Sequence, residues 1–139
     1  MKGFSNGPFL NKGKIEKSGQ DNVESLRIKT PSLDEVTAQL SGGNQQKVVI
    51  GKWVNTDADI FIFDEPTRGI DVGAKYEIYQ LIIDLAKQGK TIVMVSSEMP
   101  ELLGTCDRIL VMSGGKLAGE VDAKTATQEE IMTLAAKYV

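Results

Sequence analysis

Short apolar runs and one long amphipathic segment dominate the second half of this sequence. Residues 60–63 are four consecutive apolar residues between two aspartates, and residues 91–96 form a second run with a continuous apolar centre. Between them, residues 71–88 carry apolar side chains at helical spacing, with Asp71 as the N-cap and Gly89 at the position that ends a helix. Continuous apolar strands joined through a helix predict a parallel sheet that is covered on both faces.

The chain after this segment predicts further elements with clear turn and capping signals. They are a short helix at 99–103, hairpin strands at 108–112 and 116–121, and a terminal helix from Thr127 to Lys137. Gly114 and Gly115 supply the hairpin turn. Thr127, followed three residues later by Glu130, is a capping-box pattern that starts the last helix.

The first half of the chain has weaker signals. Residues 1–20 are polar and rich in glycine, which predicts an irregular segment with room for one strand. Residues 22–28 predict a short helix, and residues 32–35 carry a capping-box pattern that predicts a second one. The turn at 40–43 precedes residues 44–54, whose apolar positions form a stripe of helical spacing.

Composition narrows the chemistry that this chain can perform. Its 139 residues include no histidine and one cysteine, Cys106. Histidine bases, Ser-His-Asp triads, HExxH zinc sites and intrachain disulfides are therefore excluded, so acid–base chemistry falls to Asp, Glu, Lys or Tyr. The net charge of −3 argues against a basic nucleic-acid-binding surface, and no apolar run approaches the roughly 20 residues that cross a bilayer.

Two carboxyl groups directly follow the first apolar run. Ligands of open α/β sheets bind outside the carboxyl ends of the strands. Asp64 is therefore a candidate for holding Mg²⁺, directly or through water, and Glu65 for orienting and deprotonating an attacking water. The alternative is a solvated acidic strand end followed by a proline turn.

A serine and two glycines at a predicted helix start form a second candidate site. Ser41, Gly42 and Gly43 leave backbone N–H groups at the positive end of a helix dipole, which is suited to an anion. The alternative is a serine N-cap with a flexible glycine turn. The site lies 24 residues before Glu65, counted from Ser41, and this pairing favours a nucleotide.

Together these segments resemble the motifs of the ABC ATPase family. Residues 40–47 resemble the signature motif, 60–66 the Walker B strand with its catalytic glutamate, and 68–71 the D-loop. Residues 95–98 stand at the switch position, with Ser97 where most cassettes have histidine. The resemblance implies an α/β, partial P-loop NTPase fold. Its parts would be a mainly parallel sheet with flanking helices, a signature helix and a C-terminal β-hairpin.

The same resemblance implies ATP and Mg²⁺ as cofactors and a role for each site residue. It implies catalytic roles for Asp64, Glu65 and Ser97, with Asp64 also holding Mg²⁺ through water. The residues implied to contact nucleotide are Ser41, Gly42, Gly43, Gln45 and Asp71.

The subtype resembles monosaccharide importers that carry two cassettes in one polypeptide. Residues 41–47, 64–75 and 96–101 are similar to the second cassette, while 102–112 and 123–128 look most like the galactose/methyl-galactoside type, with the ribose type close behind. This resemblance implies three partners, namely the first cassette, transmembrane permease subunits and, indirectly, a sugar-binding protein. It also implies the cytoplasmic face of the membrane as location and no nucleic-acid partner.

The sequence departs from the family pattern because no segment fits the P-loop, Gly-x₄-Gly-Lys-Ser/Thr. The nearest segment, residues 13–15, has Pro8 in place of the first glycine. We therefore expect the C-terminal part of a second cassette, inactive by itself. The expected parts are an irregular start at 1–20, a piece of the helical subdomain at 21–56, and the C-terminal part of the ATP-binding core at 57–139. The alternatives are an ABC ATPase of the DNA-repair or chromosome type and a non-catalytic interaction module.

Overall fold

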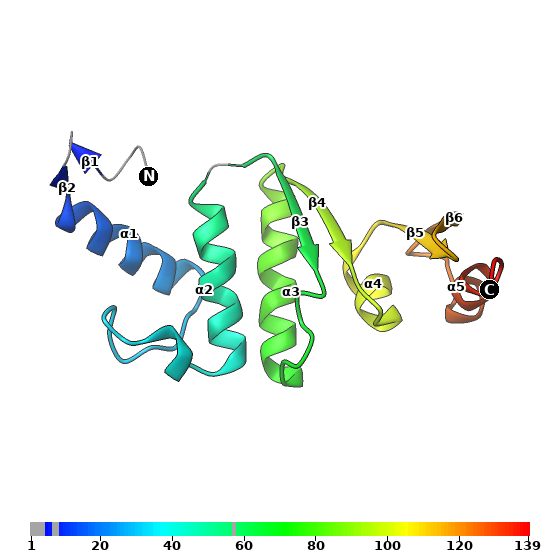
Figure 1. The fold of residues 1–139 in the computed structure, drawn as a ribbon, viewed down its shortest axis with the longest axis horizontal. Coiled ribbons are helices and arrows are strands. Elements are labelled where there is room, and N and C mark those ends of the chain that lie inside the picture. The colour runs from blue at the N-terminus through cyan, green and yellow to red at the C-terminus, as the bar shows by residue number, and fades with distance from the viewer. Residues whose placement is uncertain (1–4, 7–8, 57) are drawn as a thin grey trace. The chain divides into compact units, whose positions relative to one another are not determined.

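The computed structural model describes residues 5–6, 9–56 and 58–139 (Figure 1). In chain order the elements are β1 (Ser5–Asn6), β2 (Phe9–Leu10), α1 (Lys12–Ser25), the short 3₁₀ helix η1 (Thr37–Gln39), α2 (Gly42–Val54), β3 (Ile60–Asp64), α3 (Val72–Lys87), β4 (Thr91–Val95), α4 (Met99–Thr105), β5 (Arg108–Ser113), β6 (Lys116–Asp122) and α5 (Gln128–Ala135). Within the described residues, no helix is long and apolar enough to span a membrane.

The chain divides into two compact units. The first holds the residues up to Phe61 together with Thr67–Ile92, and the second holds Ile62–Pro66 together with Val93–Val139. Helices α1, α2 and α3 therefore lie in the first unit, and α4, the β5–β6 hairpin and α5 lie in the second. Strands β3 and β4 contribute residues to both.

Helices α2 and α3 lie side by side in the first unit (Figure 1). Ile78, Ile82 and Leu85 form the buried stripe of α3, and Ile50 is the most buried apolar side chain of α2. The predicted start of α3 is confirmed, because Oδ1 of Asp71 accepts a hydrogen bond from the third residue of the helix. The α2 prediction is also confirmed, with a start two residues earlier than expected.

The prediction of an irregular segment at residues 1–20 is wrong from residue 12 onward, where α1 begins. Asn11 caps this helix, its Oδ1 accepting a hydrogen bond from the N–H of Lys14 at 3.0 Å. Gly13 and Gly19 suggested a loop, yet both lie within the helix. Gly19 faces Leu33, whose methyl groups would lie 3.5 Å from a Cβ placed there, so contact with a later segment supports a helix of weak propensity.

Helix α1 ends in a Schellman motif instead of continuing to residue 28 as predicted. Arg27 has a left-handed φ of 52°, and the N–H of Ile28 donates to the carbonyl oxygen of Val23 at 2.9 Å. Leu26 and Ile28 are buried, and Leu26 packs so tightly on α2 that a Cβ on Gly51 would lie 2.5 Å from it. The end of α1 is therefore anchored on the helix that carries the candidate anion site.

The helix predicted to start at residues 32–35 is absent from the described structure. The Thr30 hydroxyl donates to the carbonyl oxygen of Ser32 at 2.7 Å. Residues 33–34 form only a turn. Among the described residues from 36 to the start of α2, the one helical turn is η1.

Strands β3 and β4 form a parallel pair. The N–H of Thr91 donates to the carbonyl oxygen of Asp59 at 2.8 Å where both strands begin, and the N–H of Glu65 donates to that of Val95 at 2.8 Å where both end. Because start pairs with start and end with end, the two strands run in the same direction. The predicted parallel arrangement is confirmed for this pair.

The expectation that this sheet is covered on both faces is wrong for the described chain. Along β3, Phe61 is 6% exposed, whereas its neighbours Ile60 and Ile62 are 62% and 72% exposed. Successive side chains of a strand point to opposite faces, so one face of β3 packs inside and the other does not.

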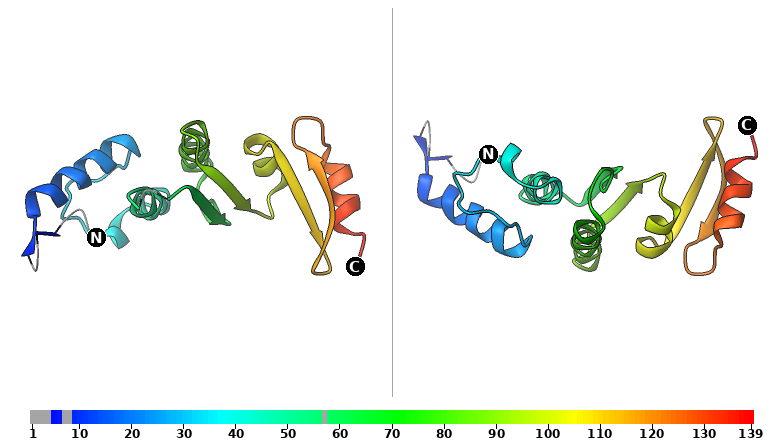
Figure 2. Two further views of the ribbon diagram at one scale, coloured as in Figure 1. Left: turned by 90° about the horizontal axis from the view of Figure 1, so that it is seen from above. Right: turned by 90° about the horizontal axis from the view of Figure 1, so that it is seen from below.

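The β5–β6 hairpin and α5 form the core of the second unit, and Figure 2 shows α5 lying along the hairpin. Core side chains come from alternate positions of both strands and from the helix, namely Ile109, Val111, Val121, Ala123 and Ile131. The turn glycines have φ of 53° and 75°, and Thr127 accepts a hydrogen bond from the N–H of Glu130 at 3.2 Å. The predicted hairpin and cap are confirmed, although α5 ends at Ala135, two residues before Lys137.

Candidate functional site

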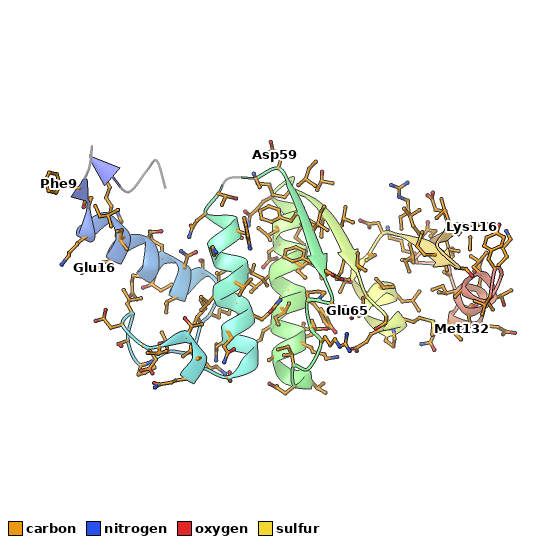
Figure 3. The ribbon with its side chains drawn as sticks, viewed as in Figure 1. Phe9, Glu16, Asp59, Glu65, Lys116 and Met132 are labelled. Atoms are coloured by element: carbon orange, nitrogen blue, oxygen red, sulfur yellow. The ribbon has the colours of Figure 1, made fainter. Side chains whose placement is uncertain are left out.

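The carboxyl end of β3 carries the first group of candidate site residues, all within the second unit. Asp64 ends the strand and is exposed, and Glu65 follows it with a left-handed φ of 46° (Figure 3). Its N–H is bound to β4, and its Oε1 accepts a hydrogen bond from the N–H of Ser97 at 3.1 Å. The structure therefore brings together Glu65 and Ser97, two of the residues predicted to be catalytic.

The backbone of Glu65 is strained. A side chain with Cβ in the left-handed region costs on the order of 1–2 kcal/mol, and such residues persist only where the surroundings hold them. Here two hydrogen bonds hold the residue, one through its N–H and one through its carboxyl group. The arrangement directs a carboxyl group to the end of the strand, where ligands of α/β sheets bind.

A hydrogen-bond network next to Ser97 joins Ser96, Glu98 and the buried carboxyl group of Glu101. The carboxyl group of Glu101 is buried at 4% exposure and accepts a hydrogen bond from the hydroxyl of Ser96. The same hydroxyl oxygen accepts from the N–H of Glu98 at 3.0 Å. The helix predicted at 99–103 includes Glu101, which lies in the first turn of α4, but sequence reasoning missed its link to Ser96.

Asp64 is the one residue predicted to hold a metal. Across residues 5–6, 9–56 and 58–139, no three Cys, Asp or Glu side chains gather into a metal-binding group. Mg²⁺, however, is commonly held by one or two carboxylates together with phosphate oxygens and water. An exposed carboxyl group at the end of a strand fits that kind of partial site.

The start of α2 carries the second group of candidates, within the first unit. Ser41 is the N-cap residue, yet its side chain makes no capping hydrogen bond. Its hydroxyl instead accepts from Nδ2 of Asn44 at 2.9 Å, and Oδ1 of Asn44 accepts from the N–H of Lys29 at 2.8 Å. Gln45 is also turned to the preceding loop, with Nε2 donating to the carbonyl oxygen of Leu40 at 2.8 Å.

These contacts leave the first turn of α2 without a side-chain cap, which is compatible with the anion site that stays a prediction here. A pocket of about 250 Å³ lies beside it, lined by Lys29, Ser41, Gly43, Asn44, Lys47, Asp71, Gly73, Ala74 and Glu77. Three predicted nucleotide-binding residues, Ser41, Gly43 and Asp71, thus share one pocket. Gly42 and Gln45 are not part of its lining.

An ion pair that sequence reasoning missed is part of the lining of this pocket. Lys47 of α2 is 1% exposed, and its ammonium group binds the carboxyl group of Glu77 on α3 and donates to the carbonyl oxygen of Arg27 at 2.8 Å. The hydrogen bond from Lys47, and then its charge, lower the pKa of Glu77 below its ordinary value of 4.5. A lysine within the apolar stripe of a predicted helix was the only sequence signal for this pair.

Comparison with known proteins shows close relatives. Residues 9–68 match the ABC transporter family. The galactose/methyl galactoside import ATP-binding protein MglA of Clostridium perfringens is 62% identical over 131 residues, which cover 94% of this chain and 25% of that protein. The protein of the same name from Treponema pallidum is 55% identical over 131 residues, covering 94% of this chain and 26% of the relative. The chain thus spans about a quarter of the length of these relatives.

Solved structures agree on the fold. An ABC transporter in an inward-facing conformation aligns with a TM-score of 0.79 at 20% identity, over 96% of this chain and 53% of that chain. A dimeric ATP-binding cassette in a post-hydrolysis state, bound to ADP and Pi, aligns with a TM-score of 0.72 at 22% identity, over 88% of this chain and 53% of that one. The predicted fold class, a partial α/β domain of this architecture, is confirmed.

Proposed function

We propose that this chain carries part of an ABC ATPase cassette and serves in the ATP-hydrolysing subunit of a monosaccharide importer, as the C-terminal part of the second cassette. Identities of 55–62% to proteins named as galactose/methyl galactoside import ATP-binding proteins support this substrate class. The same names do not favour the alternative of a DNA-repair or chromosome-type ATPase. The division into a helical subdomain at 21–56 and an ATP-binding core at 57–139 belongs to this proposal.

The observation that carries the proposal is the hydrogen bond between Ser97 and Glu65. A general base must face the water that it deprotonates. The Ser97 N–H holds Oε1 of Glu65 at 3.1 Å, which fixes the orientation of the carboxyl group and leaves its second oxygen to accept a proton. Ser97 thus acts through its backbone and does not need the histidine that most cassettes have here.

Asp64 would hold Mg²⁺ through water next to this base. When bound, Mg²⁺ neutralises charge that develops on the transferred phosphoryl group of ATP. The exposed carboxyl group of Asp64, directly before Glu65, is placed to accept hydrogen bonds from water bound to the ion. The lack of a P-loop in this sequence means that the lysine and the backbone cradle for the β- and γ-phosphates must come from another part of the subunit.

The start of α2 would face the γ-phosphate of the opposite nucleotide. We place that nucleotide on the P-loop of the first cassette, in a pair of cassettes that closes on ATP and reopens after hydrolysis. Ser41, Gly42 and Gly43 offer N–H groups at the positive end of α2. Gln45 supports them by holding the preceding loop, and Asp71 lines the same pocket.

The partners proposed are the first cassette, the transmembrane permease subunits that the cassettes drive and, indirectly, a sugar-binding protein. This places the subunit on the cytoplasmic face of the membrane. No nucleic acid is among these partners.

The test is Glu65→Gln in the complete ATP-binding subunit assembled with its permease. Glutamine keeps an acceptor for Ser97 but cannot take a proton, so ATP binding should stay near wild type. Hydrolysis at this site should fall by on the order of 100-fold or more. Total sugar uptake falls less if the first cassette carries most of the flux, so single-turnover hydrolysis is the decisive measurement. Glu129→Gln, on the exposed face of α5, is the matched control. Wild-type single-turnover rates for Glu65→Gln would contradict the proposal.

A further inference from the structure

We infer that Glu101 is a positioning residue for Glu65, acting through the hydroxyl of Ser96 and the backbone of Ser97. The inference deepens the proposed function and rests on it for the meaning of Glu65 as a base. All four residues lie in the second unit of the chain. Neither Glu101 nor Ser96 is among the residues predicted from the sequence to act at this site.

The first link is a fixed carboxyl group. Glu101 lies in the first turn of α4 and is 4% exposed, so its side chain has little room to change direction. The hydroxyl of Thr105, one turn later in the same helix, donates to the Glu101 carbonyl oxygen at 2.6 Å and ties down its backbone.

The second link is a hydroxyl with two hydrogen bonds. Ser96 donates its proton to the carboxyl group of Glu101 and accepts the N–H of Glu98 at 3.0 Å. A hydroxyl has a single donor, so its direction is set once Glu101 takes that donor. The Ser96 side chain therefore holds the turn from Ser96 to Glu98. It bonds to Glu101 and also to the N–H of Glu98 at the end of the turn.

The third link reaches the base itself. The N–H of Ser97 belongs to the peptide plane that follows Ser96, and a rigid plane transmits the orientation of one residue to the next. This N–H donates to Oε1 of Glu65 at 3.1 Å. Since Glu65 sits in a strained backbone conformation with φ of 46°, its carboxyl direction depends on such outside contacts.

Stability alone does not account for the polar pair behind the turn. Burying a carboxyl group such as that of Glu101 is costly unless it is hydrogen-bonded, and apolar side chains of similar volume often stabilise a core as well or better. A hydrogen-bonded pair supplies direction, which an apolar contact does not. Direction is what a base needs when a misplacement of about 1 Å costs up to about 100-fold in rate.

The experiment compares substitutions at Ser96 in the complete ATP-binding subunit with its permease. Ser96→Ala removes the relay, and Ser96→Thr keeps a hydroxyl at the same position. Thr133→Val is the matched control, because it also removes a hydroxyl that donates to a helix carbonyl oxygen, but in α5 and with no part in the relay. Glu101→Leu and Glu101→Gln form a second pair that removes or keeps an acceptor for the hydroxyl.

Two measurements decide the outcome. Amide hydrogen exchange at Ser97 and Glu98 should become about ten-fold faster in Ser96→Ala, and single-turnover hydrolysis should fall by about ten- to 100-fold with KM for ATP unchanged. Ser96→Thr and Glu101→Gln should restore both values toward wild type, and Thr133→Val should leave both near wild type.

Exchange and hydrolysis in Ser96→Ala that match those in Thr133→Val would overturn the inference. If Glu101→Leu does not fold, the Ser96 pair decides, since it keeps Glu101 in place. Failure of the proposed function would look different. Glu65→Gln would then hydrolyse ATP like wild type, while the exchange rates of Ser97 and Glu98 would still show whether Ser96 holds the turn.

Discussion

Gly43 and Ala74 approach so closely that a Cβ placed on Gly43 would lie 2.4 Å from the Cβ of Ala74. The contact joins the first turns of α2 and α3, beside the pocket that both residues line. Gly43 therefore has a packing role in addition to the phosphate role that its motif predicts. Gly42 differs, since a Cβ there would meet only a methyl group of Ile70 at 3.4 Å.

We predict that Gly43→Ala destabilises the chain by about 1–3 kcal/mol, because the new methyl group overlaps Ala74 and forces the two helices apart. Urea unfolding followed by circular dichroism measures the change. Gly42→Ala is the control and should shift the free energy of unfolding by less than about 1 kcal/mol. Adding Ala74→Gly to Gly43→Ala should recover part of the loss, and a double variant as unstable as the single one would place the cost elsewhere.

The ion pair between Lys47 and Glu77 predicts a pH-dependent part of the stability. The pKa of Glu77 is lowered in the folded chain, first by the hydrogen bond from Lys47 and then by its charge, from an ordinary value of 4.5. The unfolded chain therefore binds this proton at higher pH than the folded chain. The stabilisation is complete above pH 4.5 and is lost as the pH falls through the lowered pKa.

The measurement is the difference in unfolding free energy between wild type and Glu77→Gln as a function of pH. It should be largest near neutral pH and shrink below pH 4.5. The same comparison in a Lys47→Met background should show little pH dependence, since the partner is gone. An equal pH dependence in both backgrounds would show that another group perturbs Glu77.

Replacing Arg27 with glycine should increase the stability of the chain. It occupies the left-handed position after α1 with φ of 52°, where a Cβ costs about 1–2 kcal/mol. The greater flexibility of glycine in the unfolded chain offsets part of this gain. We expect Arg27→Gly to stabilise the chain by about 0.5–1 kcal/mol in urea unfolding. Arg27→Ala keeps the strain and should give no gain; a similar gain for alanine would assign the effect to the arginine side chain.

Strong local signals made part of the fold predictable. Asp71 and Gly89 bracket α3 as their residue types indicate, and Gly114 with Gly115 forms the hairpin turn. The part of α1 before residue 22 was missed because its support is not local. Its glycines weaken the helical pattern, and the contacts that hold it come from residues such as Leu33 later in the chain.

The site was predictable in its members but not in its connections. Both carboxyl groups after β3 and the glycines before α2 follow from motif and spacing. The hydrogen bond from Ser97 to Glu65 spans 32 residues, and the ion pair of Lys47 with Glu77 spans 30. Such contacts depend on how strands and helices pair in space, which the periodicity of a single segment does not contain.

Substitutions at Gly42 can separate the effect of the α2 start on folding from its proposed effect on nucleotide binding. Its position is exposed and has room for a side chain, and an acidic residue in the first turn of a helix is favourable by about 0.3–1 kcal/mol. Gly42→Asp should therefore fold at least as stably as Gly42→Asn, which has the same shape without the charge.

In the complete transporter the same charge should be harmful. A carboxylate about 4 Å from a phosphate oxygen costs about 4 kcal/mol at the effective dielectric of a protein surface, which corresponds to on the order of 1,000-fold. We expect Gly42→Asp to lose ATP-driven sugar uptake and ATP hydrolysis at the site that α2 faces, and Gly42→Asn to keep a substantial part of both. Uptake near wild type in a well-folded Gly42→Asp protein would mean that this helix start does not face nucleotide. Equal loss in the aspartate and asparagine variants would mean that side-chain volume, and not charge, decides the effect.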